Sequence, residues 1–361
     1  METIPWNRFH THNGVLAVNN ATLKDLAALA GVSPATASRV LSGHPATSAR
    51  ARQAVEAAVR ELDFVPNAQA RALRSTRSDT IGLLVSDIRN PFFADLAHTI
   101  EQAALNLGYV TLLGNANENA QQHDRYINAL ISRQVDGIIV APQGDSSDAI
   151  KSLTSRSIPT VFVDRIIPGV DVPSVTTDSD AGIRQAVSHL VGLGHDRIGY
   201  IAGPQTVSTG RDRLSSFTAA LAANGLTVDP DLIFYGNFQA ASGSAAVHAL
   251  LSVPHPPTAL FAADSLMAVG ALAVVHRLGL QIGVDIAIVT FDDIEWFALL
   301  DPPLSVVSHS VEEMGRIAVE LLVDVMNGGR PKSVCQTSEL IIRGSSAHAI
   351  LPRTAGLRGS N

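Results

Sequence analysis

The chain has 361 residues, of which 46% are hydrophobic and 16% are charged, so it is long enough for two or three domains and has the composition of a packed, soluble protein. Its one cysteine, Cys335, excludes an intrachain disulfide and a cysteine-based metal site, and it favours a cytoplasmic location. The net charge of −7 is divided unevenly. Residues 21–80 carry eight basic and five acidic side chains, whereas residues 81–361 carry 17 basic and 27 acidic ones, which indicates a small basic module on an acidic body.

Residues 1–20 contain no long apolar run, so they are not a persuasive secretory signal, and we interpret them as a flexible leader. No segment of the sequence resembles a transmembrane span, so we expect no membrane partner.

Residues 22–42 predict two short helices joined by a tight turn, the geometry with which a helix enters a DNA groove. Gly31 ends the first helix, and Ser33 is placed to cap the second. The apolar side chains of the two helices face each other and leave a small, hydroxylated outward face. That face consists of Ser33, Pro34, Ala35, Thr36, Ser38 and Arg39. It suits the DNA major groove, where arginine recognises guanine and hydroxyls meet phosphates, although an ordinary helical hairpin has the same pattern.

Ser48 can cap a third helix over residues 49–64, which completes a headpiece at residues 21–64. Residues 65–80 then form a linker, either a short helix or a solvated connection that contains Leu73 by chance.

From residue 81 onward, apolar strand-like segments alternate with helical segments in repeats of about 25–30 residues. Such repeats predict parallel sheets with helices on both faces, and a second series near residue 182 predicts a second lobe. We assign the lobes and the tail as follows: the first lobe to residues 81–178 and 294–308, the second to residues 179–293 and 309–347, and a flexible tail to residues 348–361. Ligands bind beyond the carboxyl ends of parallel strands, so the sequence predicts a cleft between the lobes.

Polar and aromatic side chains gather at the predicted strand ends and on the segment that crosses between the lobes. The candidate ligand residues are Asn90, Phe92, Phe93, Asp164, Arg165, Arg213, Phe238, Asp264, Asp292 and His309. Carboxylates and arginines pair with adjacent hydroxyls, and aromatic rings cover the C–H faces of a sugar, so this set favours a small sugar or polyol. Each residue also has a structural alternative, because a phenylalanine at a strand end usually belongs to the core and an aspartate there usually caps the next helix. If His309 lines the site, ligand affinity should vary between about pH 5.5 and 7.5.

The sequence resembles the LacI/GalR family of bacterial transcription regulators in three stretches. They are TLKDLAALAGVSPATASRVLSGHP from residue 22, VPNAQARALRS at residues 65–75 and IGLLVSDIRNPFF at residues 81–93. The resemblance implies an α/β chain with an N-terminal helix-turn-helix headpiece and a two-lobed body like that of type I periplasmic binding proteins. It also implies that residues 65–80 form a hinge helix on operator DNA, that Leu73 enters the minor groove, and that Thr22 and Asn67 contact the DNA. Among the ligand residues, it strengthens Arg213, Phe238 and Asp292 most.

Two positions depart from the family pattern inside the expected cleft. The pair Asp264-Ser265 stands where the family often has Asn-Asp, and His309 stands where glutamine is common. Both changes alter hydrogen-bond donors and acceptors, so the effector need not be a common ligand of the family.

The sequence therefore predicts a transcription regulator, specifically a repressor, that binds double-stranded operator DNA under the control of a sugar-like effector. We expect a homodimer, with a tetramer left open, because one headpiece offers too little surface for tight binding. We expect no catalytic residue, cofactor or metal site, because the sequence has no phosphate-binding glycine loop, no metal-ligand spacing and no nucleophile elbow. The alternatives are a solute receptor for transport and a sugar-processing enzyme. The predicted headpiece argues against the receptor, and the lack of a recognisable acid–base pair argues against the enzyme.

Overall fold

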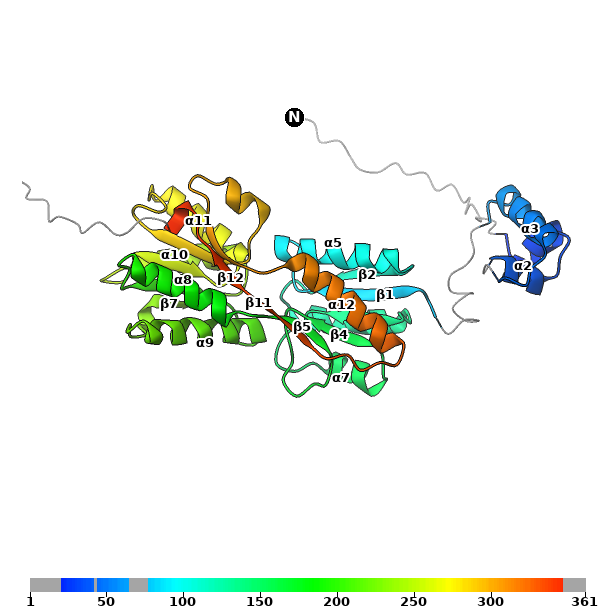
Figure 1. The fold of residues 1–361 in the computed structure, drawn as a ribbon, viewed down its shortest axis with the longest axis horizontal. Coiled ribbons are helices and arrows are strands. Elements are labelled where there is room, and N and C mark those ends of the chain that lie inside the picture. The colour runs from blue at the N-terminus through cyan, green and yellow to red at the C-terminus, as the bar shows by residue number, and fades with distance from the viewer. Residues whose placement is uncertain (1–20, 42–43, 65–76, 347–361) are drawn as a thin grey trace, which may run out of the picture. The chain divides into compact units, whose positions relative to one another are not determined.

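A computed structural model describes residues 21–41, 44–64 and 77–346 (Figure 1). The chain divides into two compact units, Met1–Ser78 and Asp79–Asn361, and we refer to their described parts as the headpiece and the body. None of the helices in those described ranges has the length and apolarity that a membrane crossing requires. The α/β fold class expected from the sequence is confirmed.

The headpiece consists of α1 (Leu23–Leu29), α2 (Pro34–Leu41) and α3 (Ala49–Glu61). The hydroxyls of Ser33 and Ser48 cap α2 and α3, accepting hydrogen bonds at 3.1 and 3.2 Å from backbone N–H groups. Gly31 takes a left-handed φ of 66° in the turn, which glycine adopts without steric cost. The buried centre is formed by Leu26, Ala27, Ala37, Val55 and Ala58. Only one face of α2 is therefore used for packing.

The first lobe of the body is built on a six-stranded parallel sheet with the order β11-β5-β4-β3-β1-β2. Its strands are β1 (Thr80–Val85), β2 (Val110–Asn115), β3 (Gly137–Val140), β4 (Thr160–Val163), β5 (Ser174–Asp178) and β11 (Val334–Thr337). One face of the sheet packs against α5 (Pro91–Asn106) and α12 (Val311–Met326), and the other packs against α6 (Ala120–Ser132) and α7 (Asp148–Ser155). The central strands are buried on both faces, which explains their continuous apolar sequences.

The second lobe has a six-stranded sheet with the order β12-β10-β9-β8-β6-β7, in which β12 alone is antiparallel. Its strands are β6 (Ile198–Ala202), β7 (Ile233–Tyr235), β8 (Ala259–Ala262), β9 (Ala287–Phe291), β10 (Ser305–Ser308) and β12 (Glu339–Ile341). Its helices pack in two pairs, α8 (Asp180–Gly192) with α9 (Ser208–Ala223) and α10 (Ala240–Leu251) with α11 (Ser265–Arg277). The connections contain the short 3₁₀ helices η1 (Pro230–Leu232), η2 (Glu295–Leu299) and η3 (Gly344–Ser346).

The lobe boundaries differ from those expected from the sequence. Strand β10 pairs with β9, so residues 305–308 belong to the second lobe rather than the first. Helix α12 packs against α5, and β11 pairs with β5, so residues 311–337 belong to the first lobe rather than the second. Strands β11 and β12 follow each other closely in the chain but are separated at Ser338, because β11 pairs with β5 in one sheet and β12 with β10 in the other. An apolar run predicts a strand, but it does not identify the strand's neighbour.

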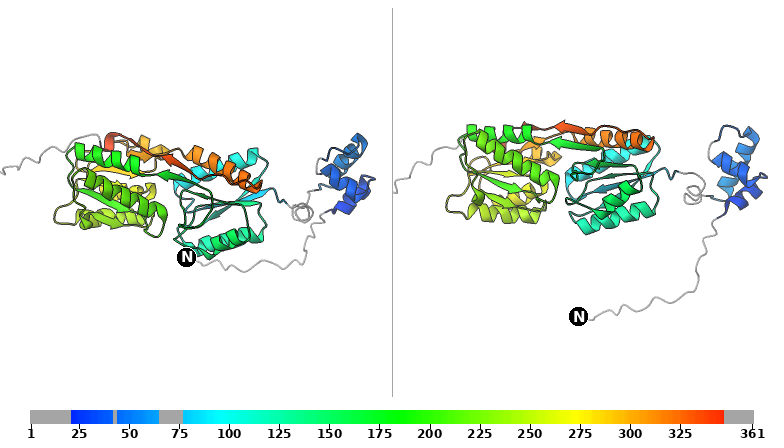
Figure 2. Two further views of the ribbon diagram at one scale, coloured as in Figure 1. Left: turned by 60° about the horizontal axis from the view of Figure 1, so that its bottom comes forward. Right: turned by 90° about the horizontal axis from the view of Figure 1, so that it is seen from below.

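The chain consequently crosses between the lobes three times, after β5, after β10 and between β11 and β12. Figure 2 shows the C-terminal crossing beside the segment that joins β5 to α8. Buried Ser338 connects these two crossings, because its hydroxyl donates to the carbonyl oxygen of Asp178 at 2.7 Å and accepts from the backbone N–H of Gly182 at 3.3 Å. These three segments are the covalent connections about which the lobes could move.

The packing of α10 against α11 depends on glycine at their closest approach. A β-carbon at Gly270 would lie 1.8 Å from the carbonyl oxygen of Ala240, whereas one at Gly192, at the end of α8, would meet nothing within 4 Å. We expect Gly270→Ala to lower the free energy of unfolding by about 1–3 kcal/mol or more, because the two helix backbones must separate. The matched change Gly192→Ala should leave it unchanged or raise it by up to about 1 kcal/mol. Urea unfolding of both variants tests this, and equal effects would contradict the close approach.

Candidate ligand cleft and nucleic-acid interface

The predicted outward face of α2 is accessible in the headpiece. Ser33, Pro34, Ala35 and Arg39 are exposed, Thr36 and Ser38 are half-buried, and Ala37 between them is fully buried. The cap formed by Ser33 orients the first turn of α2, which carries three of these side chains. The headpiece thus presents the kind of surface that a DNA groove accepts: short side chains, hydroxyls and one guanidinium.

Thr22 has a defined structural role at the start of α1. It forms a capping box with Asp25, whose carboxylate accepts from the Thr22 backbone N–H at 2.8 Å and from the Thr22 hydroxyl at 2.7 Å. The hydrogen bond from the hydroxyl holds the pKa of Asp25 below its usual value. Asn67 and Leu73, the other two residues expected to contact DNA, lie outside the described residues.

In the body, nine of the ten predicted ligand residues line one cleft between the lobes. The cleft is lined by Asn90, Phe92, Phe93, Asp164, Arg165, Thr209, Arg213, Phe238, Asp264 and Asp292. Residues between positions 90 and 165 come from the first lobe, and those between 209 and 292 come from the second. Thr209, in the first turn of α9, is the one lining residue that sequence reasoning missed.

Three lining residues sit on strained backbone where the chain leaves a strand. Asp164, Phe238 and Asp292 have left-handed φ values of 64°, 59° and 69°. The backbone N–H of Asp164 is held by the carbonyl oxygen of Val175 at 2.9 Å, and that of Asp292 by the carbonyl oxygen of Val307 at 3.0 Å. Such conformations cost about 1–3 kcal/mol each and are found where surrounding structure over-determines them, as it does at functional sites.

Arg165 lines the cleft between aromatic rings of the two lobes. Its guanidinium donates two hydrogen bonds to the carboxylate of Glu118 at 2.8 and 2.7 Å, and both side chains are buried. Its carbon Cζ lies 5.8 Å from the ring centre of Phe93 and 5.2 Å from that of Phe238, so aromatic rings from both lobes flank it. Glu118 was not predicted, because it lies in a loop where two residues in a row have left-handed φ values, and the sequence gives no sign of this turn.

Arg213 lies between two carboxylates without a direct hydrogen bond to either. Its guanidinium is 3.9 Å from the nearest oxygen of Asp164 and 3.8 Å from that of Asp292, and it stacks 3.8 Å from the ring centre of Phe291. One of its N–H groups donates to the carbonyl oxygen of Ala263 at 2.7 Å. The long ion pairs leave the carboxylate oxygens able to accept hydrogen bonds from a ligand.

Two helix N-caps meet across the cleft. The amide of Asn90, which caps α5, donates to the carboxyl group of Asp264, which caps α11, at 2.8 Å. The hydroxyl of Ser265 donates to the amide oxygen of Asn90 at 3.0 Å. Burial raises the pKa of Asp264 to about 8. Because Asp264 and Ser265 both bond to Asn90, the pair that departs from the family pattern is part of the direct contact between the lobes.

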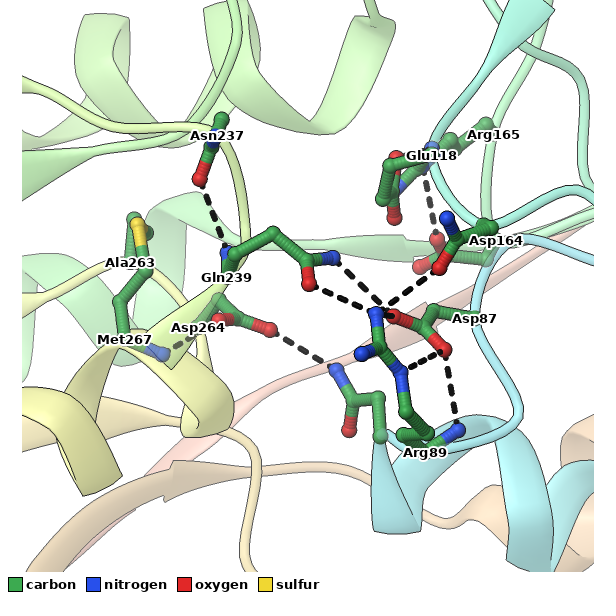
Figure 3. Close-up of polar contacts among 12 residues, drawn as sticks. Asp87, Arg89, Glu118, Asp164, Arg165, Asn237, Gln239, Ala263, Asp264 and Met267 are labelled. Carbon is green, nitrogen blue, oxygen red and sulfur yellow. Dashed lines mark hydrogen bonds and ion pairs between the residues drawn. The ribbon is translucent and has the colours of Figure 1, made fainter. Parts of the chain in front are cut away.

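A second network joins the lobes at the rim of the cleft (Figure 3). Gln239, which precedes α10, accepts from the guanidinium of Arg89 at 2.8 Å and donates to the carboxylate of Asp87 at 3.0 Å. Gln239 of the second lobe thus contacts two side chains of the first lobe. Within the first lobe, Arg89 also donates to Asp87 and to Asn117. Sequence reasoning missed this network, because nothing in the sequence indicates that Asp87 and Arg89 contact Gln239, which lies 150 residues from Arg89.

His309, the tenth predicted residue, lies behind the cleft rather than in it. Its side chain is 1% exposed, it packs 5.5 Å from the ring centre of Phe92, and its Nδ1 is 4.0 Å from Asp292. Burial lowers its pKa to about 4. Any titration of His309 therefore falls below the interval of pH 5.5–7.5 expected from its ordinary pKa.

Known proteins resemble both the headpiece and the body of this chain. Residues 22–67 match the family described as bacterial regulatory proteins, lacI family, and residues 187–346 match a periplasmic binding protein-like domain. The HTH-type transcriptional repressor CytR of Escherichia coli (strain K12) is 37% identical over 328 residues, which cover 90% of this chain and 96% of that repressor. The regulator GalR of the same organism is 34% identical over 301 residues, covering 83% and 88% of the two chains.

The chain belongs to the LacI family.

Solved structures of this family share its architecture. The lac repressor dimer bound to operator and the anti-inducer ONPF superposes with a TM-score of 0.80 at 29% identity, covering 90% of this chain and 98% of that chain. The complex of the transcriptional regulator CelR with cellobiose gives a TM-score of 0.69 at 34% identity, covering 90% and 99%. This LacI-family protein is a DNA-binding transcription regulator, and its body has the periplasmic-binding-protein-like fold. In the described part of the chain, no group of three His, Cys, Asp or Glu side chains could hold a metal ion.

The buried position of His309 makes stability depend on pH. Its pKa is about 4 in the folded protein and 6.5 in an unfolded chain, so between these values the unfolded chain binds a proton that the folded protein does not. The free energy of unfolding is therefore unaffected by the titration of His309 above pH 6.5. As the pH falls towards 4, protonation of the unfolded chain lowers the free energy of unfolding by at most about 3 kcal/mol. We expect His309→Gln to remove this part of the pH dependence.

Urea unfolding at pH 7 and at pH 4.5 measures the difference between the wild type and this variant. Replacement of the exposed His276 by Gln is the control and should follow the wild type. Parallel pH profiles for the wild type and His309→Gln would contradict the buried, neutral state of His309.

Proposed function

We propose that this protein is a repressor that binds a two-fold symmetric operator as a homodimer, and that a sugar or sugar derivative in the cleft controls its operator affinity. The class of effector is inferred from one observation. Three buried polar atoms of the cleft residues have no hydrogen-bond partner: Nε of Arg165, the hydroxyl of Thr209 and Oδ1 of Asp292. They supply a donor, a group that both donates and accepts, and an acceptor, which is the complement of adjacent sugar hydroxyls.

The aromatic side chains around these atoms support the same class of ligand. Phe92 and Phe93 come from the start of α5, and Phe238 comes from the opposite lobe. An aromatic ring packs well against the C–H face of a sugar, while the polar atoms between the rings fix its hydroxyls. The related regulator CelR was solved in complex with cellobiose, which is in keeping with a sugar here.

We infer that the cleft and the operator are linked because different arrangements of the two lobes differ in their affinity for the effector and for DNA. A ligand that contacts Arg165 in one lobe and Asp292 in the other favours one arrangement of the lobes over others. Operator binding then changes with the ligand only as far as the two arrangements differ in their affinity for DNA. The dimer is inferred from the limited surface of one headpiece and from the related lac repressor, which was solved as a dimer bound to its operator.

We further infer a cytoplasmic protein without enzymatic activity. A regulator must reach the chromosome, and the related CytR is a transcriptional repressor. The headpiece also disfavours the solute-receptor alternative, since such a receptor has no use for a DNA-binding surface.

Selection of DNA from a random duplex library by the full-length protein tests the proposal. We expect enrichment of a near-palindrome, and complexes with two protein chains per site. Thermal-shift screening with sugars and nucleosides would then find effectors, because a ligand that binds only the folded state raises its stability. Failure to enrich any sequence would overturn operator binding, and a single chain bound at full affinity would overturn the dimer.

Arg39 should read one base pair in each half-site. Its guanidinium lies on the exposed face of α2, where two N–H groups can pair with guanine. We expect Arg39→Ala to weaken operator binding by about 1–3 kcal/mol and to relax preference at one position of each half-site. Binding assays on the selected operator and on its single-base variants measure both effects. A uniform loss on all sequences would instead mean that Arg39 contacts only phosphate.

Arg213 should be needed for the effector response but not for DNA binding. It faces two cleft carboxylates, whereas Arg197 pairs with Asp229 within the second lobe and does not line the cleft. We expect Arg213→Ala to abolish the change in operator affinity caused by the effector, while effector-free binding persists. Arg197→Ala is the matched control and should still respond. Calorimetry that finds unchanged effector affinity in Arg213→Ala would show that the ligand binds elsewhere.

A further inference from the structure

The cleft contains more carboxyl groups than guanidinium groups. Asp164, Asp264 and Asp292 line it, and Glu118 is bound to Arg165. The opposing cations are Arg165 and Arg213. With all four carboxyl groups ionised the set carries a net charge of −2, and with Asp264 protonated it carries −1. Burial raises the pKa of Asp164 and Asp292 while the two arginines lower it, and with both ionised an anion would enter a region of negative charge that is shielded from water.

Both guanidinium groups already lie beside carboxylates, with which an added anion would have to compete. Both terminal nitrogens of Arg165 donate to Glu118, at 2.8 and 2.7 Å, and Asp164 lies 3.4 Å from its Nε. Arg213 has one carboxylate on each side, at 3.9 and 3.8 Å. A phosphate needs a guanidinium with two parallel N–H groups directed at it, and here the pair on Arg165 is already used by Glu118.

Two of the three helix N-termini at the cleft are already capped by side chains of the protein. Helix N-termini attract anions, but α5 is capped by the side chain of Asn90 and α11 by the carboxyl group of Asp264. Helix α9 also begins here, and the hydroxyl of Ser208 in its first turn accepts from the backbone N–H of Ile166 in the other lobe. The N-termini of α5 and α11 are thus engaged by groups of the protein itself, while α9 is preceded by Val207, which provides no side-chain cap.

We propose that the cleft selects an effector without negative charge and rejects the phosphorylated or carboxylated form of the same sugar, and that Glu118 is the positioning residue responsible. Glu118 neutralises Arg165 and holds it between Phe93 and Phe238, with only Nε left for the ligand. This inference rests on the proposed effector site, since it defines the charge class of the molecule bound there.

A sulfate titration tests the role of Glu118 without requiring the effector. The full-length wild type, Glu118→Gln and the control Glu320→Gln are heated in increasing sodium sulfate, with sodium chloride matched for ionic strength. Glu320 pairs with Arg316 on the exposed face of α12, so the control removes the same charge from an arginine far from the cleft. We expect the apparent sulfate affinity of Glu118→Gln to exceed that of the wild type by about tenfold or more, because a charge-assisted pair becomes available. The control should behave as the wild type does.

Paired ligands give a second test, on the wild type alone, that does not depend on whether the variant folds. Calorimetry with ribose and ribose 5-phosphate, glucose and glucose 6-phosphate, and adenosine and adenosine 5′-monophosphate compares neutral and anionic forms. We expect each phosphate ester to bind at least about tenfold more weakly than any parent compound that binds. A phosphate ester that binds more tightly than its parent, or a folded Glu118→Gln protein with unchanged sulfate affinity, would overturn the inference. Absence of binding by every parent sugar would count against the proposed sugar effector, while the sulfate result would still decide the role of Glu118.

Discussion

The arrangement of this protein depends on one topological constraint. Both sheets of the body are almost entirely parallel, and strands β4 and β9 deliver Asp164 and Asp292 to the same cleft from opposite lobes. Parallel strands end at one edge of a sheet, so residues distant in sequence become neighbours there without any local signal between them. Left-handed backbone at Asp164, Phe238 and Asp292 then turns these side chains into the space between the lobes. At Asp164 and Asp292 the backbone N–H is held by a carbonyl oxygen of one neighbouring strand, Val175 in β5 and Val307 in β10, which makes the strain tolerable.

The lobes are in direct contact through groups that a ligand would also use. The bond between Asn90 and Asp264 and the contact of Gln239 with Asp87 and Arg89 stabilise one arrangement of the lobes. Arg165 fills the space between two aromatic rings that could otherwise flank a ligand. A ligand must therefore compete with these internal contacts as well as make its own. The result is a binding site whose occupation is tied to the relative position of the lobes, which is what an allosteric regulator requires.

Much of this arrangement could be predicted from local sequence. The helix starts at Ser33 and Ser48 followed from capping chemistry, and the strand ends that carry Asp164 and Asp292 followed from apolar runs that stop at a charged residue. The predictions that failed were those that depend on tertiary contacts. The assignment of α12 and β10 to lobes was wrong because helical and strand periodicity do not specify which sheet a segment joins. Glu118 was missed because its position depends on an unusual turn. His309 was expected to line the cleft because its position in the sequence does not reveal that its side chain is buried.

We infer that one conformational equilibrium connects the cleft with the headpiece's affinity for DNA. The most direct test is to measure, by calorimetry, the affinity of an effector found by screening for the free protein and for the protein saturated with its selected operator. Thermodynamic linkage requires that operator binding change effector affinity by the same factor by which the effector changes operator affinity. We expect two equal factors, both different from one. An effector that binds the free and operator-bound protein equally well would contradict this equilibrium.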